Sequence, residues 1–257
     1  MKVLLINGSP KMERSNSLKL SRAFLEGWSS MEELDVEEIT VEKMEITSCM
    51  GCLNCWKRTP GKCVYDDEMS ACLEKYMAAD VLVWSFPLYF YSLPGRLKMF
   101  LDRTCPTNRP VIGDRTDGIG NGTHASRYDK AHQRNILIST CGHVSDKGNY
   151  KAVEDQFDLC LGFRNYTTLF CGQGEMLALP FLKDRAEEYL GYVREAGEDY
   201  GRYGIILPKT RAKLEELIMP KEEFEKQANG YYAHMEKKAA ERAAAAAAEA
   251  AAKEAQG

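Results

Sequence analysis

The feature that most constrains this chain is the regular alternation of short apolar runs with stretches of helical periodicity. The apolar runs that we predict to be strands are residues 2–7, 34–41, 80–86, 134–140 and 165–171. The stretches with helical periodicity are residues 17–28, 66–79, 94–103, 151–161 and 181–200. This alternation is typical of a parallel sheet with helices on both faces. We therefore predict an α/β fold with a doubly wound, five-stranded parallel sheet in the order 2-1-3-4-5.

A sheet of this order predicts where a ligand binds. Ligands of doubly wound sheets lie at the carboxyl ends of the strands that flank the switch point. The switch point in this chain falls between the first and third predicted strands. Segments 8–17, 87–93 and 140–143 follow the first, third and fourth strands. We expect these three segments to converge on one cleft.

Composition divides the chain into a large first part and a polar, Ala-rich end. We predict a domain at residues 1–205, a helical extension at 206–235 and an Ala-rich helical tail at 236–257. Two short helices are expected beyond Pro208, and the tail has high helix propensity but no apolar face. Residues 104–132 are rich in Gly and Pro and are predicted to be an irregular loop, either functional or connective.

Charge and hydropathy exclude several classes of function. The formal net charge of −4 gives no electrostatic reason to expect binding to nucleic acid or to an acidic membrane surface. No apolar run approaches the roughly 20 residues that a membrane-spanning helix needs. The apolar run at the N-terminus is too short for a signal peptide, and a turn follows it. We therefore expect a cytoplasmic protein.

The segment between the first strand and the first helix is a candidate phosphate-binding loop. Its hydroxyl and amide side chains, together with the free backbone N–H groups at the start of the helix, can donate to phosphate oxygens. The candidate residues are Ser9, Lys11, Ser15, Asn16 and Ser17. The segment has neither the glycine spacing of dinucleotide sites nor the motif of P-loop NTPases, so it suits a monophosphate. The alternative is that these are ordinary turn and N-cap residues.

The two other segments are candidates for holding a flat aromatic ring. Aromatic side chains that follow a central strand offer stacking surfaces, and a small flexible backbone after the fourth strand permits close approach. The candidate residues are Pro87, Leu88, Tyr89, Phe90, Tyr91, Thr140, Cys141 and Gly142. The alternative is that the aromatic rings only cover the end of the sheet. No catalytic residue is assigned, although Tyr89 and His143 are candidates to line the cleft.

The segments NGSPKMERSNS, WSFPLYFYSLPGRLKMFLDR and ISTCGH, in this order at strand ends, carry a family resemblance. The chain resembles the NADPH-dependent FMN reductase and iron–sulfur flavoprotein group of the flavodoxin-like superfamily, from residue 1 to about residue 200. The resemblance implies a flavodoxin-like fold that binds FMN, with the phosphate at the first segment and the ring between the other two. It also implies a homodimer or homotetramer.

Four of the nine cysteines follow the pattern C-x2-C-x2-C-x7-C, at Cys49, Cys52, Cys55 and Cys63. Two-residue gaps let consecutive thiolates bind neighbouring corners of a cubane, and the pattern is similar to the motif of iron–sulfur flavoproteins with a [4Fe–4S] cluster. A loop of redox-active or merely reduced thiols and a zinc site stay open as alternatives. Four of the other cysteines are predicted to be packing residues: Cys72, Cys105, Cys160 and Cys171.

The sequence thus predicts an FMN-dependent NAD(P)H oxidoreductase that passes electrons to a quinone, a nitro or azo compound, a flavin or another small acceptor. NAD(P)H would be a co-substrate that stacks on the flavin, and the flavin would carry the chemistry. The alternative is an iron–sulfur flavoprotein that carries electrons from a ferredoxin-like donor through a [4Fe–4S] cluster and FMN. A flavin-free binding module on the same fold is a third hypothesis.

Overall fold

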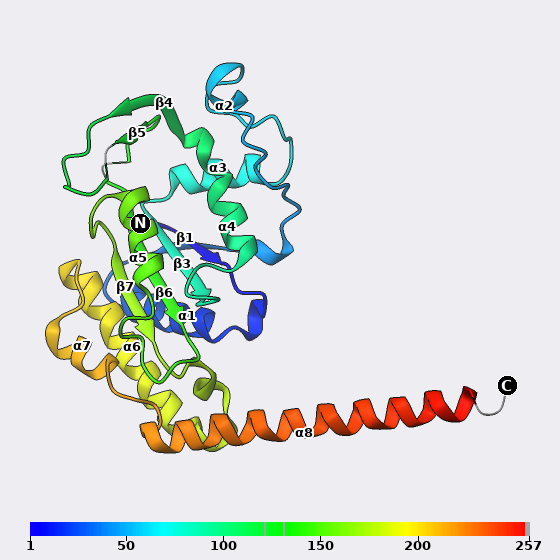
Figure 1. The fold of residues 1–257 in the computed structure, drawn as a ribbon. Coiled ribbons are helices and arrows are strands. Elements are labelled where there is room, and N and C mark those ends of the chain that lie inside the picture. Colours follow the sequence, from blue (N-terminus) through cyan, green and yellow to red (C-terminus); the bar gives the residue numbers. More distant parts are fainter. Residues whose placement is uncertain (121, 131, 255–257) are drawn as a thin grey trace. The chain divides into compact units, whose positions relative to one another are not determined.

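The computed structural model describes residues 1–120, 122–130 and 132–254. Its centre is a five-stranded parallel sheet in the order β2-β1-β3-β6-β7 (Figure 1). The strands of this sheet are β1 (Lys2–Asn7), β2 (Asp35–Thr40), β3 (Val81–Pro87), β6 (Arg134–Thr140) and β7 (Thr167–Cys171). Counted within the sheet, this is the order 2-1-3-4-5, so the predicted fold class is confirmed.

Helices cover both faces of the sheet, which explains why its central strands read as continuous apolar runs. Helices α1 (Asn16–Ser29) and α6 (Lys183–Tyr203) pack against each other on one face. They approach closely at Gly197, where a Cβ atom would stand 1.9 Å from the carbonyl oxygen of Phe24. Helices α3 (Met69–Ala78), α4 (Gly95–Asp102) and α5 (Lys151–Leu161) share a core on the other face.

Trp84 on β3 lies at the centre of that second core. Its ring contacts Phe100 of α4 and Phe157 of α5 edge-on, and its indole N–H donates to Asn135 Oδ1 at 3.0 Å. All three aromatic side chains are fully buried. Because β3 is held on both sides by neighbouring strands and here by two helices, the segment that leaves its carboxyl end starts from a rigid point.

The connection at residues 104–132 differs from the sequence prediction. It contains an antiparallel pair, β4 (Asn108–Gly113) and β5 (Thr123–Ser126), after the short 3₁₀ helix η3 (Cys105–Thr107). Almost all of the residues in the two strands are exposed, so no alternation of buried and exposed positions marks them. Positions 121 and 131 of the predicted loop lie outside the described residues.

The remaining elements are short, except at the end of the chain. They are the 3₁₀ helices η1 (Met12–Arg14), η2 (Val41–Lys43), η4 (Gly174–Ala178) and η5 (Pro180–Leu182), and the helices α2 (Asn54–Lys57), α7 (Pro208–Leu214) and α8 (Lys221–Glu254). Instead of two short helices beyond Pro208, the chain forms one short helix and one of 34 residues. Residues 255–257 of the predicted tail lie outside the described part of the chain.

The chain forms two compact units, one at Met1–Ile218 and one that begins at Met219. The first contains the sheet and all of the candidate site residues, and the second contains α8. The division at residues 205 and 235 stays a prediction. Within the described residues, every helix is too short or too polar to cross a lipid bilayer.

Candidate functional site

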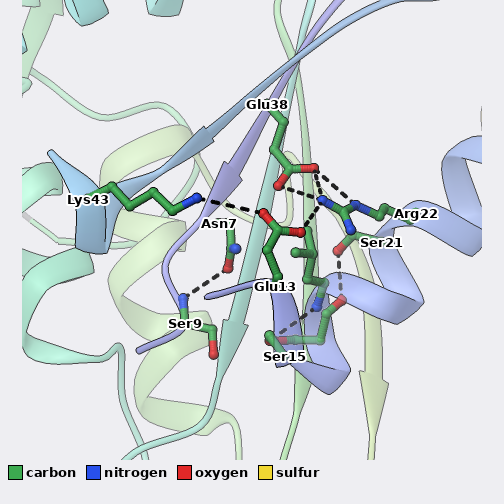
Figure 2. Close-up of polar contacts among 10 residues, drawn as sticks. Asn7, Ser9, Glu13, Ser15, Ser21, Arg22, Glu38 and Lys43 are labelled. Carbon is green, nitrogen blue, oxygen red and sulfur yellow. Dashed lines mark hydrogen bonds and ion pairs between the residues drawn. The ribbon is translucent and has the colours of Figure 1, made fainter. Parts of the chain in front are cut away.

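The predicted phosphate loop connects β1 to α1 through η1. Ser15 is the N-cap of α1, because its hydroxyl oxygen accepts from the backbone N–H of Leu18 at 3.3 Å. The same hydroxyl lies 2.9 Å from that of Ser17. Ser9 is held at its backbone, because its N–H donates to Asn7 Oδ1 at 3.1 Å (Figure 2). The hydroxyls of Ser15 and Ser17 thus contact each other at the helix cap, while the N–H groups of the first helical turn keep no intrahelical acceptor.

An acidic residue inside a phosphate loop needs an explanation, because its charge repels an anion. Glu13 lies in η1, and its carboxylate accepts from Arg22 at 2.8 Å and faces Lys43 at 4.0 Å (Figure 2). Arg22 also binds Glu38 on β2 at 2.9 Å. These ion pairs are exposed and contribute little to stability. They nevertheless place the Glu13 carboxylate between two cations, Arg22 and Lys43. A groove beside the loop adds the basic side chains of Arg14, Lys19 and Arg194.

The segment after β3 forms a two-residue hairpin. The backbones of Tyr89 and Ser92 exchange hydrogen bonds of 3.0 and 2.9 Å around Phe90 and Tyr91. Both corner residues are in the left-handed region, with φ of 48° and 61°. Such corners favour Asn and Gly, and a bulky residue there is strained. The Phe90 side chain is fully exposed, at 102 %. The rings therefore do not simply cover the end of the sheet.

The segments after β3 and β6 are bonded to each other. Pro87 and Thr140 are register partners, and the backbone N–H of Leu88 donates to the carbonyl of Thr140 at 2.8 Å. Beyond this point the rings of Tyr91 and His143 stack, with centroids 5.5 Å apart and planes at 19°. Cys141 and Gly142 lie between these contacts. The Cys141 thiol is buried, and its burial raises its pKa, so it stays protonated at neutral pH.

A fourth segment, which the sequence analysis missed, joins the phosphate loop to the other two. It follows β7, and its Gly174 carbonyl accepts from Asn16 Nδ2 at 2.8 Å. The N–H of Gly174 donates to the carbonyl of Cys141 at 2.9 Å. A Cβ atom at Gly174 would lie 2.5 Å from Cβ of Thr140, so only glycine fits without a shift. In the sequence, Gln173 has a glycine on each side, directly after a predicted strand. This pair of glycines was the available signal for a close backbone approach.

The predicted cysteine ligands line one cavity, which we call the cysteine pocket. Its wall contains Cys49, Cys52, Cys55 and Cys63, together with Cys105, which the sequence analysis had taken for a packing residue. The Cys55 thiol donates to Cys105 Sγ at 3.8 Å. Burial raises the pKa of Cys55, and burial together with the nearby thiols raises the pKa of Cys105 to about 12. Cys55 and Cys105 are therefore neutral thiols at neutral pH.

The cysteine pocket offers the donor set of two kinds of metal site. Among the described residues, no three His, Cys, Asp or Glu side chains are placed to hold one metal ion. Four cysteine thiolates are the usual ligands of a [4Fe–4S] cluster. Four cysteines are also the ligands of one class of structural zinc site.

A buried arginine also lines the cysteine pocket. Arg103 is 1 % exposed and binds Asp67 through two bonds of 2.7 and 2.8 Å. Burial would lower the pKa of Arg103, but Asp67 and the nearby Cys63 outweigh burial and raise it, so the guanidinium stays charged. Its Nε–H has no hydrogen-bond partner within the part of the chain that is described. A buried donor without a partner is costly, and an anionic group in the pocket would satisfy it.

The exposed β4–β5 hairpin braces the cysteine segment. Trp56 of α2 donates its indole N–H to the Cys105 carbonyl at 3.3 Å and packs on His124 of β5, with ring centroids 4.7 Å apart. On the next turn of the segment, Gly61 lies so close to Arg127 that a Cβ atom would stand 3.0 Å from its side chain. The connection that was predicted to be irregular therefore has a structural role beside the pocket.

The strand order and the loops bonded at the carboxyl edge define a doubly wound α/β protein, a class whose members bind ligands at the switch point. The sequence matches the family described by its flavodoxin-like fold over residues 1–174. The chain belongs to this flavodoxin-like family.

Relatives of known name fall into two groups. An iron–sulfur flavoprotein of Methanocaldococcus jannaschii is 33% identical over 106 residues, which cover 41% of this chain and 53% of the relative. An FMN-dependent NADH:quinone oxidoreductase of an Exiguobacterium species is 32% identical over 111 residues, which cover 39% of this chain and 53% of the relative. The chain thus spans about half the length of these curated relatives, and it is related to both groups.

A solved structure gives the same fold. An FMN-dependent NADH-azoreductase from Bacillus anthracis, in complex with FMN, matches with a TM-score of 0.55 over 78% of this chain and 99% of that chain. The sequence identity is 20%, so this likeness concerns the fold alone.

Proposed function

We propose that this protein is an FMN-dependent NAD(P)H oxidoreductase that reduces a quinone, a nitro or azo compound, a flavin or another small acceptor. The observation that carries the proposal is the meeting of the loops after β1, β3, β6 and β7, tied by hydrogen bonds from Asn16, Leu88 and Gly174. Beside them stands a strained, exposed aromatic hairpin. Strained backbone of this kind persists where function requires it.

Each loop has a distinct role in holding FMN. The phosphate would lie at the start of α1, where backbone N–H groups carry positive potential, and Ser9, Lys11, Ser15, Asn16 and Ser17 are the residues proposed to surround it. The flavin ring would lie between the hairpin at residues 87–91 and the segment Thr140, Cys141 and Gly142. Bound there, FMN supplies a ring that accepts hydride from NAD(P)H and passes the electrons on.

The residues around the proposed ring site restrict what the protein itself does in the reaction. Tyr91 and His143 stack on each other and would hold the ring or the acceptor by its flat face. The neutral Cys141 thiol is buried and offers no general base. The protein would therefore contribute binding and orientation, with no proton transfer by a side chain required.

The test is spectroscopic. The full chain, purified and supplied with FMN, should retain a yellow flavin spectrum after gel filtration, and NADH or NADPH should bleach it with acceptor-dependent turnover. Ser15→Glu places a negative charge at the phosphate position and should weaken FMN at least tenfold, while Ser29→Glu at the far end of α1 serves as the control. Equal FMN affinity of the Ser15 variant and the wild type would refute the phosphate assignment.

A second candidate function is electron transfer through a [4Fe–4S] cluster and FMN, with a ferredoxin-like donor. The observation that favours it is the cysteine pocket, where Cys49, Cys52, Cys55 and Cys63 surround one cavity beside the unpartnered Nε–H of Arg103. The four thiolates would hold the cluster, which supplies one-electron steps between donor and flavin.

Anaerobic purification distinguishes the two candidates. A brown protein with iron and acid-labile sulfide, slow with NAD(P)H, supports the carrier, whereas a yellow protein without iron that NAD(P)H bleaches rapidly supports the enzyme. Cys52→Ala should abolish iron binding and leave FMN bound. Light scattering on the same samples tests the expected homodimer or homotetramer, and a monomer would contradict it.

A further inference from the structure

Two polar groups on the wall of the cysteine pocket are not among the proposed ligands. Arg103 and Cys105 both come from the turn that follows α4, two residues apart. The Arg103 side chain is fixed by Asp67 and by the Thr47 carbonyl, which its guanidinium binds at 2.5 Å, yet its Nε–H lacks an acceptor among the residues described. Cys105 Sγ lies 3.8 Å from Cys55 Sγ.

The sulfur atoms of Cys55 and Cys105 lie 3.8 Å apart, which is too close for each to bind a separate corner of one cluster. Two thiolates on one tetrahedral ion, with metal–sulfur bonds of about 2.3 Å, lie about 3.8 Å apart, so this pair alone matches a single-ion spacing. A single ion would need further ligands, and in the described part of the chain no third His, Cys, Asp or Glu joins such a group. Cys55 belongs to the pattern C-x2-C-x2-C-x7-C and Cys105 does not, so we take Cys105 to be the neighbour of a ligand.

A thiol next to a metal-bound thiolate acts as a hydrogen-bond donor. Without metal, the Cys55 thiol donates to Cys105; once Cys55 gives up its proton to bind iron, only Cys105 has an S–H left to donate. The backbone of Cys105 is held in place by the indole of Trp56, which donates to its carbonyl at 3.3 Å. The direction of the bond thus reverses when Cys55 is deprotonated.

We propose that Cys105 is a positioning residue that donates its S–H to the metal-bound sulfur of Cys55, with the Nε–H of Arg103 as a second donor, and that the two raise the reduction potential of a cluster held in the cysteine pocket. Donors to cluster sulfurs stabilise the more negative, reduced form, which is one of the means by which proteins set such potentials. The inference rests on the second candidate function above.

The test compares reduction potentials. Wild type, Cys105→Ala, Cys105→Ser and Cys160→Ala are reconstituted anaerobically with iron and sulfide, assayed for iron, sulfide and FMN, and titrated potentiometrically with detection by electron paramagnetic resonance. Cys105→Ala should keep its iron and shift to a more negative potential. Cys105→Ser keeps a donor and should restore most of the shift, and Cys160→Ala, which removes a thiol on α5, should match wild type. Arg103→Lys keeps the charge without the Nε–H and should also shift negatively.

The outcomes separate this inference from the function on which it rests. Loss of iron in Cys105→Ala would make Cys105 a ligand and overturn the inference, as would an unchanged potential. Wild-type protein that takes up no iron would overturn the cluster and this inference together. The FMN content of the same samples tests the flavin proposal independently of the iron content and the reduction potential.

Discussion

The aromatic hairpin allows a direct test of whether its strained backbone destabilises the protein and supports FMN binding. Replacing Phe90 by Asn and Tyr91 by Gly inserts the pair that a two-residue hairpin favours. A bulky residue in the left-handed region costs about 1–2 kcal/mol. Gly removes this cost at position 91, and Asn, which tolerates the region although it keeps a Cβ atom, removes part of it at position 90, so the gain is roughly 2–3 kcal/mol. Phe90 is fully exposed, so its removal sacrifices no buried surface.

Two losses reduce that gain. The stack of Tyr91 on His143 is worth roughly 1 kcal/mol, and the added glycine costs up to about 1 kcal/mol of chain entropy. We therefore expect the FMN-free double variant to be more stable than wild type by about 1 kcal/mol. For a chain of this size, that corresponds to a rise in Tm of roughly 2–4 °C.

The assay is urea unfolding of the FMN-free protein followed by circular dichroism, because bound FMN would add its own stabilisation. FMN affinity is then measured by fluorescence quenching and should fall at least about fivefold, the equivalent of one lost aromatic contact. Phe90→Asn alone keeps the stack on His143 and should gain stability with a smaller loss of affinity. A double variant that is no more stable than wild type, or that binds FMN equally well, would refute the reasoning.

Three further predictions concern packing and charge. Gly174→Ala should weaken FMN binding and lower the free energy of unfolding by about 1–3 kcal/mol, measured by urea unfolding, because its Cβ atom would collide with Thr140. Gly197→Ala should destabilise by about 3 kcal/mol by forcing α1 and α6 apart, whereas Gly191→Ala on the same helix, with open space, should stabilise by about 1 kcal/mol. Asp67→Asn should cost about 3 kcal/mol by leaving a buried arginine unpaired. Burial raises the pKa of Asp67, but the hydrogen bonds and charge of Arg103 outweigh burial and lower this pKa below 3.8. The ion pair therefore stabilises the protein fully above about pH 4 and loses this contribution as the pH falls further. Thermal melts between pH 2 and pH 7 should show the loss of this contribution in wild type and not in Asp67→Asn.

The sheet and the meeting of its loops were predictable from sequence because each depends on local periodicity. Apolar runs set the strands, and the carboxyl ends of parallel strands share one edge whatever the details of side chains. The start of α1 moved by a single residue, from Ser17 to Asn16, since Ser15 serves as the cap. These features need no knowledge of distant contacts.

The parts that could not be predicted depend on contacts across the chain. Cys105 reaches the cysteine pocket because α4 packs beside the cysteine segment, a contact between residues 50 positions apart that no spacing rule reveals. The β4–β5 pair is exposed on both faces and carries no periodic signal. Gly174 becomes informative only after β7 is known to end next to Thr140.

Helix α4 links the two proposed sites. It starts at Gly95, shortly after the aromatic hairpin, and ends at Asp102, next to Arg103 and Cys105 on the wall of the cysteine pocket. Eight residues at 1.5 Å each give this helix a length of about 12 Å. A flavin bound at one end and a cluster bound at the other would therefore be separated by protein, and electrons passing between them would have to tunnel across it.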